Sequence, residues 1–306
     1  MKRRLEISEL IFKIISYLFL GIFAILCLYP LVYAVSSAIS EMSYVYGLEG
    51  KRVILLPKGN LQFEAFKEII VGSAYSNRFW NSYTNTLFLT VFGTVWALGV
   101  SLIGAYALSK KRLLFRKGFN FFLVFTMWFA AGIVPQKRNY ESTQNLFNSI
   151  GITDNKWLIV IAMGMAAMNI ILLRNAFEGV PSEIEEAARI DGATEWQILT
   201  KVYIPMCKST VATVTLFFAI SRWNGYFWAD QFLKTNEEKP LQVFIHDMLV
   251  FVQDSEQTAG WNEQYIFATD SFIYALVVCS VIPILIIYPF IQKYFAKGVN
   301  MGGVKE

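Results

Sequence analysis

The sequence predicts an all-α membrane protein with six transmembrane helices and with both termini in the cytoplasm. Three observations support this prediction. The 306-residue chain is 55% hydrophobic and only 16% charged, whereas average soluble domains are about 25% charged. Six apolar segments reach or approach the length needed to span a membrane. Lysine and arginine are concentrated on one side of the membrane in the topology that these segments define.

The six apolar segments are expected to be helices. A helix needs about 20 apolar residues to cross a hydrocarbon core of about 30 Å, and hydrocarbon offers no partner for unpaired backbone N–H and C=O groups. The predicted spans are residues 14–38, 84–108, 119–134, 157–173, 209–229 and 271–291. The third and fourth are short, so their ends are the least well defined. Together they make residues 1–306 a single transmembrane domain.

The orientation follows from the positive charges. With the N-terminus inside, the inside segments hold sixteen Lys and Arg residues and the outside segments ten. The short loop 109–118 alone contains Lys110, Lys111, Arg112, Arg116 and Lys117. Cytoplasmic loops carry such an excess. Both termini, and the polar segment 181–205 between the fourth and fifth spans, are therefore predicted to be cytoplasmic.

The segment 181–205 has the pattern of two short helices. Ser182 and Glu185 match a capping box, so the first helix should begin just after Pro181. One face of that helix has small side chains at its centre. Its members are Ile184, Ala187, Ala188 and Asp191. Gly192 is placed to end the helix with a positive φ.

The second helix repeats the cap pattern with Thr194 and Gln197. Its apolar residues are Trp196, Leu199, Val202 and Tyr203. Pro205 ends it and leads into the fifth span. From the residue pattern alone, an ordinary amphipathic loop at the membrane surface fits as well as a docking element for another protein.

The spacing of the residues in this segment resembles the EAA loop of ABC-importer permeases. The residues that match are Glu186, Ala187, Ala188, Asp191, Gly192, Ile204 and Pro205, with Ile204 standing where the family more often has leucine. The resemblance implies that the first helix is a coupling helix, which inserts into a cleft of a nucleotide-binding subunit. Glu186 would contact that ATPase, Ala187 and Ala188 would permit close packing, and Gly192 would form the bend.

The resemblance extends over nearly the whole chain. The stretches NSYTNT (81–86), AYALSK (105–110), ILLRNAFEGVPSEIEEAARIDGAT (170–194) and WNGYFW (223–228) are similar to the inner-membrane subunits of carbohydrate importers. The C-terminal KYFAKGVNMGGVKE (293–306) and the Gly-x-x-Pro of residues 132–135 resemble the complex-oligosaccharide subgroup. The polar NYEST (139–143) departs from that subgroup, which puts the geometry at the outer end of the third span in question.

The resemblance also implies the partners. These are a second, homologous permease subunit, two cytoplasmic ATPase subunits and an extracytoplasmic, lipid-anchored sugar-binding protein, assembled in the lipid of the bacterial cytoplasmic membrane, with no role for nucleic acid. The chain would form half of a heterodimeric translocation pathway. The resemblance implies that this chain binds no cofactor itself, and it has no GxxxxGK[ST] motif that would cradle nucleotide phosphates. ATP and Mg²⁺ would be bound by the ATPase subunits.

The fifth span contains the best candidate substrate pathway. Its polar and aromatic cluster consists of Ser221, Arg222, Asn224, Tyr226 and Trp228. A charge inside a span is costly, by about 2.5–3.5 kcal/mol at its centre, and usually faces a cavity or water. Two roles for Arg222 fit equally well: it could line a sugar cavity, or its side chain could extend to the outer lipid headgroups. Asn224 matches the Trp-Asn pair of the family, and Gly225 would loosen the helix beside it.

Other functions are less well supported. The sequence shows no catalytic or metal-ligand pattern, and Cys27, Cys207 and Cys279 have the character of buried apolar residues. An ion-coupled secondary transporter tends to have acidic residues within the membrane, and the six predicted spans contain none. A membrane-embedded enzyme would need clustered His, Asp or Glu residues. A permease of the same family with a polyol or glycerol-phosphate cargo stays an open alternative.

Overall fold

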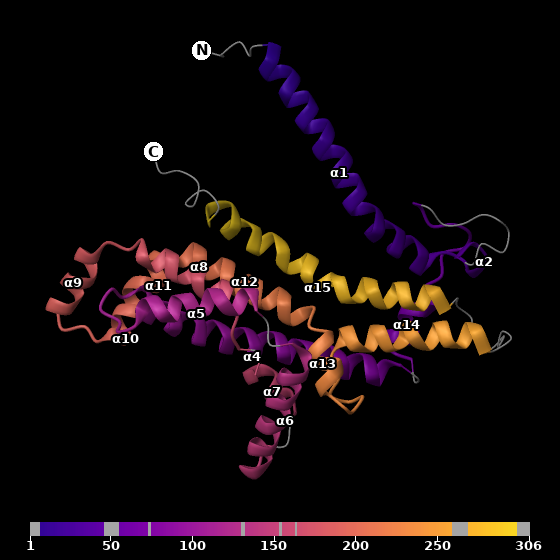
Figure 1. Ribbon diagram of the computed structural model, residues 1–306. Coiled ribbons are helices and arrows are strands. Elements are labelled where there is room, and N and C mark those ends of the chain that lie inside the picture. The colour runs from indigo at the N-terminus through magenta and orange to yellow at the C-terminus, as the bar shows by residue number, and fades with distance from the viewer. Residues whose placement is uncertain are drawn as a thin grey trace. The chain divides into compact units, whose positions relative to one another are not determined.

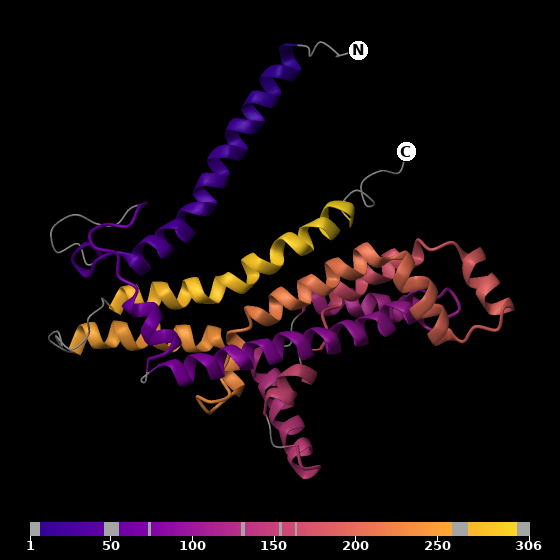
Figure 2. The ribbon, with the colours of Figure 1, turned by 180° about the vertical axis from the view of Figure 1, so that it is seen from behind.

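A computed structural model describes residues 7–45, 55–72, 75–129, 132–152, 155–162, 164–258 and 269–298. Within these ranges every regular element is a helix (Figures 1 and 2). The chain divides into two compact units, one formed by Met1–Phe79 and Ile245–Pro283 and the other by Trp80–Phe244 and Ile284–Glu306. The predicted all-helical membrane architecture is confirmed.

The first unit begins with the long helix α1 (Ile7–Ile39), which contains Pro30. None of its most apolar 18-residue window is buried within the structure, as expected for a helix that faces lipid. Only its last turns are packed, through small residues such as Ala34 and Ala38. The short helices α2 (Met42–Val45) and α3 (Glu64–Ile70) follow. The Ser36 hydroxyl donates to the Leu55 carbonyl at 2.8 Å and ties the loop between them to α1.

The remainder of the first unit comes from the C-terminal part of the chain. Helix α14 (Leu241–Thr258) contributes its residues from Ile245 onward, and α15 (Thr269–Gly298) contributes its first half. Arg78 pairs with Asp247 at 2.5 Å, and Tyr33 packs edge-on against Tyr274 with ring centroids 5.5 Å apart. Distant parts of the sequence are thereby joined within this unit.

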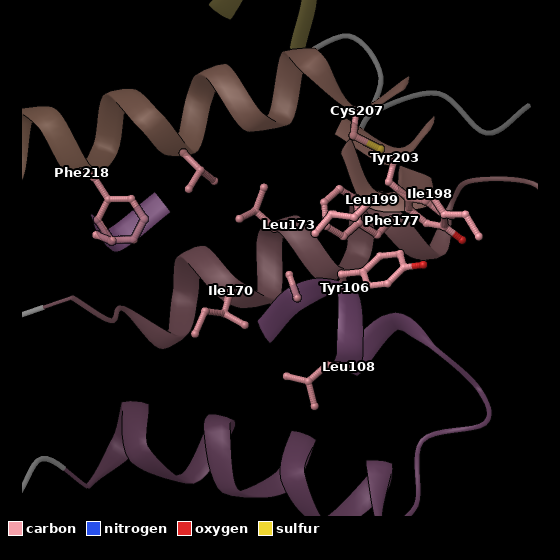
Figure 3. Close-up of a cluster of buried hydrophobic side chains, with 13 residues drawn as sticks. Tyr106, Leu108, Ile170, Leu173, Phe177, Ile198, Leu199, Tyr203, Cys207 and Phe218 are labelled. Carbon is pink, nitrogen blue, oxygen red and sulfur yellow. The ribbon is translucent and has the colours of Figure 1, made fainter. Parts of the chain in front are cut away.

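The second unit is built around helix α4 (Ser76–Ser109), from Trp80 onward. Around it pack α5 (Arg116–Trp128), α8 (Ala167–Glu178) and α12 (Lys208–Trp223). Small buried residues, among them Ala97, Ser101 and Ala105, line the packed face of α4 and let neighbouring helices approach closely, as is common between membrane helices. Figure 3 shows the resulting apolar cluster, which extends from Phe218 to Tyr203.

Two shorter helices, α6 (Ile133–Ser149) and α7 (Asn155–Ala162), complete this unit together with α13 (Phe227–Phe232). They form a second apolar cluster that includes Leu89, Tyr140, Leu158, Phe232 and Val243. The segment 181–205 lies at one end of the long helices of this unit (Figure 1).

The structure has three helices that are long and apolar enough to cross a membrane, and up to six spans if each bent helix pair counts as one. The three are Ser8–Ile39, Ser76–Ser109 and Asp270–Ile287, and they contain or match the first, second and sixth predicted spans. The predicted fourth span is bent by 49° between α7 and α8. The predicted fifth span is interrupted after Trp223 and resumes at Phe227.

The third predicted span, residues 119–134, is not one continuous helix. Helix α5 ends at Trp128, and α6 begins at Ile133 with a 115° change of direction. Gly132 adopts a φ of 81° just before α6. The polar residues that follow have little affinity for hydrocarbon, so the chain has no reason to continue α5 through them. Residues 130, 131, 163 and 299–306, which belong to predicted spans or to the C-terminal motif, lie outside the described residues.

Candidate functional site

The segment 181–205 forms two helices, as predicted. Helix α9 (Ser182–Ile190) begins directly after Pro181, and Gly192 follows it with a φ of 79°. The Gly192 amide donates to the Arg189 carbonyl and the Ala193 amide to the Ala188 carbonyl, each at 3.0 Å. These bonds satisfy carbonyls that the end of a helix leaves unpaired.

The capping box predicted at Ser182 is wrong. Pro181 occupies the cap position, and no side chain caps α9. Glu185 does not reach back to the helix start, because its carboxylate is held by Lys110 and Tyr203. A local pattern was overridden here by two residues distant in sequence.

The second predicted capping box is confirmed at Thr194. Its hydroxyl accepts from the Gln197 amide at 3.3 Å, and the Gln197 side chain accepts from the Thr194 amide at 2.9 Å. This cap starts α10 (Glu195–Ile198), which continues through the π-helical turn η1 (Leu199–Tyr203) into α11 (Ile204–Met206). Pro205 lacks an N–H and clashes with the preceding turn of a regular helix, and the wider π turn ends just before it.

Helix α9 presents a small and partly apolar surface to its surroundings. Glu186 and Ala187 are exposed, and Ile190 is 87% exposed. Ala188 instead packs against the apolar cluster of Figure 3. The predicted small-residue face is thus divided, with Ala188 on the packed side and Ala187 on the open side. Exposed apolar surface next to charged residues is typical of a contact site for another protein.

A charge cluster holds α9 against the end of α4. Its centre is Lys110, whose Nζ lies 2.7 Å from the Glu185 Oε2 and 4.0 and 3.9 Å from the ring centroids of Tyr106 and Tyr203. The Tyr203 hydroxyl donates to the same Glu185 oxygen at 2.5 Å. The side chains of Lys110 and Glu185 are only 10% and 15% exposed. The pair is therefore shielded from water and weakly screened by salt.

The cluster continues toward α10 through a second carboxylate. Arg189 bridges Glu185 at 2.6 Å and Glu195 at 3.0 Å. Glu195 also accepts from the Tyr106 hydroxyl at 2.7 Å and pairs with Arg112 at 2.6 Å. Both helices of the segment are therefore linked to the loop that follows α4.

The start of α5 also contacts α8 through polar side chains. Arg116 donates to the Leu108 carbonyl at 2.9 Å and pairs with Glu178, while Arg174 donates to Asn120 at 2.6 Å. The positive charges of residues 109–118 thus have a second role. Lys110 and Arg112 hold the 181–205 segment, and Arg116 holds α8.

The Glu185 carboxylate at the centre of the charge cluster is ionised at neutral pH. Burial would raise the pKa of Glu185, but hydrogen bonds from Lys110 and Tyr203 outweigh it and lower this pKa below its ordinary value. Burial and the bond to Glu185 raise the pKa of the Tyr203 phenol, so it stays a donor. Because the Glu185 pKa is depressed in the folded state, its stabilising contribution is present at neutral pH and is lost only as the pH falls through that lowered value.

The five predicted pathway residues line one cavity of about 560 Å³, within the range of about 300–1,000 Å³ of small-molecule pockets. Ser221 and Arg222 lie in the last turn of α12, and Asn224 lies in the break. Tyr226 precedes α13, and Trp228 lies in its first turn. Met165 and Ala166, from the break between α7 and α8, line the same cavity. Interrupted helices occur at membrane depth where they line a cavity, because the freed backbone groups need partners.

The cavity combines aromatic and amide side chains. Tyr140 and Phe232 stack with centroids 3.8 Å apart at 7°, and Trp228 stacks on Phe232 at 5.4 Å and 14°. Gln136, Asn139 and Asn169 contribute amides to the lining. Flat apolar faces beside several hydrogen-bonding groups suit a sugar ring, whose axial C–H groups and hydroxyls need both.

The structure separates the predicted residues into two sites. The pathway residues gather at the cavity, whereas Glu186, Asp191 and Pro205 lie exposed in the 181–205 segment and Ile204 packs against the cluster of Figure 3.

The sequence did not identify Glu185, Lys110 and Ile190 as functional residues. For Glu185 and Lys110, the available signal was that residues 109–118 are basic and residues 185–195 contain several acidic side chains. Phe232 follows Trp228 at the i+4 spacing that predicts contact on a helix.

The chain matches the family model described as "Binding-protein-dependent transport system inner membrane component" over residues 69–301. It is similar to a chain in the crystal structure of a bacterial ABC transporter involved in the import of the acidic polysaccharide alginate, with 41% identity and a TM-score of 0.81. That match covers 96% of this chain and 100% of the other.

Two curated relatives come from Bacillus subtilis (strain 168). One is the polygalacturonan/rhamnogalacturonan transport system permease protein YtcP, 31% identical over 96% of this chain and 98% of its own length. The other is the maltodextrin transport system permease protein MdxG, 28% identical over 97% and 98%. The helices, the cavity and these similarities lead to one conclusion: the chain belongs to the family of binding-protein-dependent inner-membrane transport components, and it is a multi-pass permease component of an ABC sugar importer in the cytoplasmic membrane.

Proposed function

We propose that this chain forms half of a heterodimeric pathway in an ATP-driven oligosaccharide importer, and that residues 181–205 couple ATPase closure to alternating access. The observation that carries the proposal is the combination of an exposed tip and a fixed base. Glu186, Ala187 and Ile190 are open to a partner, while Glu185 is locked to Lys110 at the end of α4. A push on the tip is therefore transmitted to a membrane helix.

The mechanism needs no covalent chemistry from this chain. Two ATPase subunits, which bind ATP and Mg²⁺, would close and displace α9 on the cytoplasmic side. The charge cluster would pass that displacement to α4, which also lines the cavity through Leu89. A rigid-body rearrangement of this kind switches access between two sides of a bundle. A second, homologous permease would supply the other half of the pathway, and a lipid-anchored sugar-binding protein would deliver cargo from outside.

The cargo is an oligosaccharide on two grounds. The similar proteins are described as moving alginate, polygalacturonan or rhamnogalacturonan, and maltodextrin. The cavity offers the half-buried Trp228 ring and several amides, which fit sugar rings better than a small polyol or a glycerol-phosphate. Ion coupling is not favoured, because no Asp or Glu is among the described residues that line the cavity.

Affinity purification from native membranes tests this proposal. The wild-type chain should bring down a second permease and an ATPase. Glu186→Lys should retain the permease but lose the ATPase by about tenfold or more, because an unmatched charge in a docked interface costs about 2–5 kcal/mol. Glu141→Lys, the same change on the exposed face of α6, is the control. Retention of the ATPase by Glu186→Lys, or its absence from the wild-type sample, would refute the docking role.

A further inference from the structure

We propose that the cavity contains a carboxylate subsite, with Arg222 as the residue that binds the carboxylate of an acidic oligosaccharide. The inference deepens the proposed function, on which it rests, by naming the chemical class of the cargo as uronate-containing. It concerns only residues of the second unit.

The charge of the lining is the first argument. Of the described residues that line the cavity, Arg222 alone carries a formal charge, and none is acidic. The half-buried guanidinium therefore gives the cavity a net positive charge. A guanidinium matches a carboxylate in shape as well as charge, because two parallel N–H groups meet two oxygens. A uronate would bring a negative charge to this guanidinium, whereas a neutral sugar offers it hydroxyl groups alone.

The second argument is that neighbouring residues fix the position of Arg222. A Cβ at Gly93 of α4 would lie 3.1 Å from both the Cδ and the Nε of Arg222. The arginine stem therefore passes close to the α4 backbone, where a methyl group at residue 93 would have to shift it by a few tenths of an ångström. Arg222 also lies in the last turn of α12, where a cation is favoured by the helix dipole. A side chain held along a glycine is directed by packing, unlike one that merely extends toward headgroups.

The third argument is the arrangement of groups around the charge. The break at Asn224 and Gly225 separates Arg222 from Trp228, and both line the same cavity. Trp228, the half-buried outer ring of the Tyr140–Phe232–Trp228 stack, can support a pyranose ring, while Ser221 and Asn224, close to Arg222 in sequence, line the same cavity. A phosphate alone would use the cation but not the rings, whereas a uronate ring uses both.

Uptake and binding by the purified native complex in proteoliposomes test the subsite. The probes are a short oligogalacturonate and its carboxyl-reduced, neutral counterpart. Arg222→Gln should raise the KM for the acidic probe by about tenfold to a hundredfold, the usual value of a charge-assisted hydrogen bond. It should leave the neutral probe within about twofold, while Arg222→Lys should be intermediate for the acidic probe.

Glycine variants test the same claim with Arg222 intact. Gly93→Ala should weaken uptake of the acidic probe, because the new methyl group displaces the arginine stem. Gly99→Ala on the same helix meets nothing within 4 Å and is the matched control. Equal losses for acidic and neutral probes in Arg222→Gln, or no effect of either Arg222→Gln or Gly93→Ala, would overturn the subsite.

The test separates this inference from the proposed function. Quenching of tryptophan fluorescence by the acidic probe, lost in Arg222→Gln and weakened by added salt, supports the subsite even if ATP drives no transport. ATP-driven uptake of the acidic probe that is unchanged in Arg222→Gln refutes the subsite and leaves the importer function standing.

Discussion

Replacing Gly192 by proline should reduce ATP-dependent sugar uptake to background while the chain still inserts and assembles. Gly192 has a φ of 79°, and its amide donates to the Arg189 carbonyl. Proline fixes φ near −65° and has no N–H, at a cost of about 3 kcal/mol. That cost lowers the population of the native turn by roughly a hundredfold. The exposed surface of α9 would then no longer be presented in its docked orientation.

Gly151→Pro is a matched control for this prediction. Gly151 has a φ of 84°, its amide donates to the Asn148 carbonyl, and a Cβ there would meet nothing within 4 Å. Both variants suffer the same backbone conflict, but only one lies in the 181–205 segment. Uptake into membrane vesicles, normalised to the amount of inserted chain, is the measurement. Equal losses in the two variants would show that the effect is a general failure to fold.

Breaking the Lys110–Glu185 pair should loosen α9 and uncouple transport from ATP hydrolysis. Glu185→Gln leaves the shielded Lys110 ammonium without its carboxylate, and such a change costs about 3–5 kcal/mol. Amide exchange in α9 should therefore accelerate by roughly a hundredfold or more. ATP hydrolysis by the complex should continue, but less sugar should enter for each ATP consumed, because the tip would move without carrying α4.

A double-mutant cycle isolates this pair. Lys110→Met alone should be similarly destabilising, while the double variant should lose less than the sum, since neither buried charge is then left unpaired. Arg112→Gln removes an ion pair whose two side chains are 54% and 51% exposed, and exposed pairs contribute at most about 1 kcal/mol. If Arg112→Gln accelerates exchange in α9 as much as Glu185→Gln, the buried pair has no special role.

The sequence predicted those features that depend on local composition and spacing. The apolar runs placed the long helices, because hydrocarbon permits little else. Thr194 with Gln197 predicted a cap, and Gly192 predicted a helix end, because both patterns act within a few residues. The five pathway residues were predicted together because they are neighbours along one broken helix, and the cavity contains all of them.

The features that the sequence did not predict depend on partners distant along the chain. Glu185 matched a capping box. Lys110 is 75 residues away from it in sequence, and only the fold shows that the Lys110 Nζ lies 2.7 Å from the Glu185 Oε2. The sequence could not show that Ala187 is exposed and Ala188 packed, because that depends on which side of α9 packs on the cluster of Figure 3. The bend between α5 and α6 arises where Gly132 has a positive φ, and apolar length alone does not reveal such a bend.

Cysteine labelling at Ala187 tests the central claim, that the exposed tip of α9 is where a cytoplasmic ATPase drives this permease. The test uses a chain in which Cys27, Cys207 and Cys279 are replaced and Ala187→Cys is the single thiol. A membrane-impermeant maleimide should label it in inside-out vesicles stripped of ATPase, and not in intact spheroplasts. Adding back the ATPase should protect the thiol. Labelling from outside, or labelling that the ATPase leaves unchanged, would contradict the account.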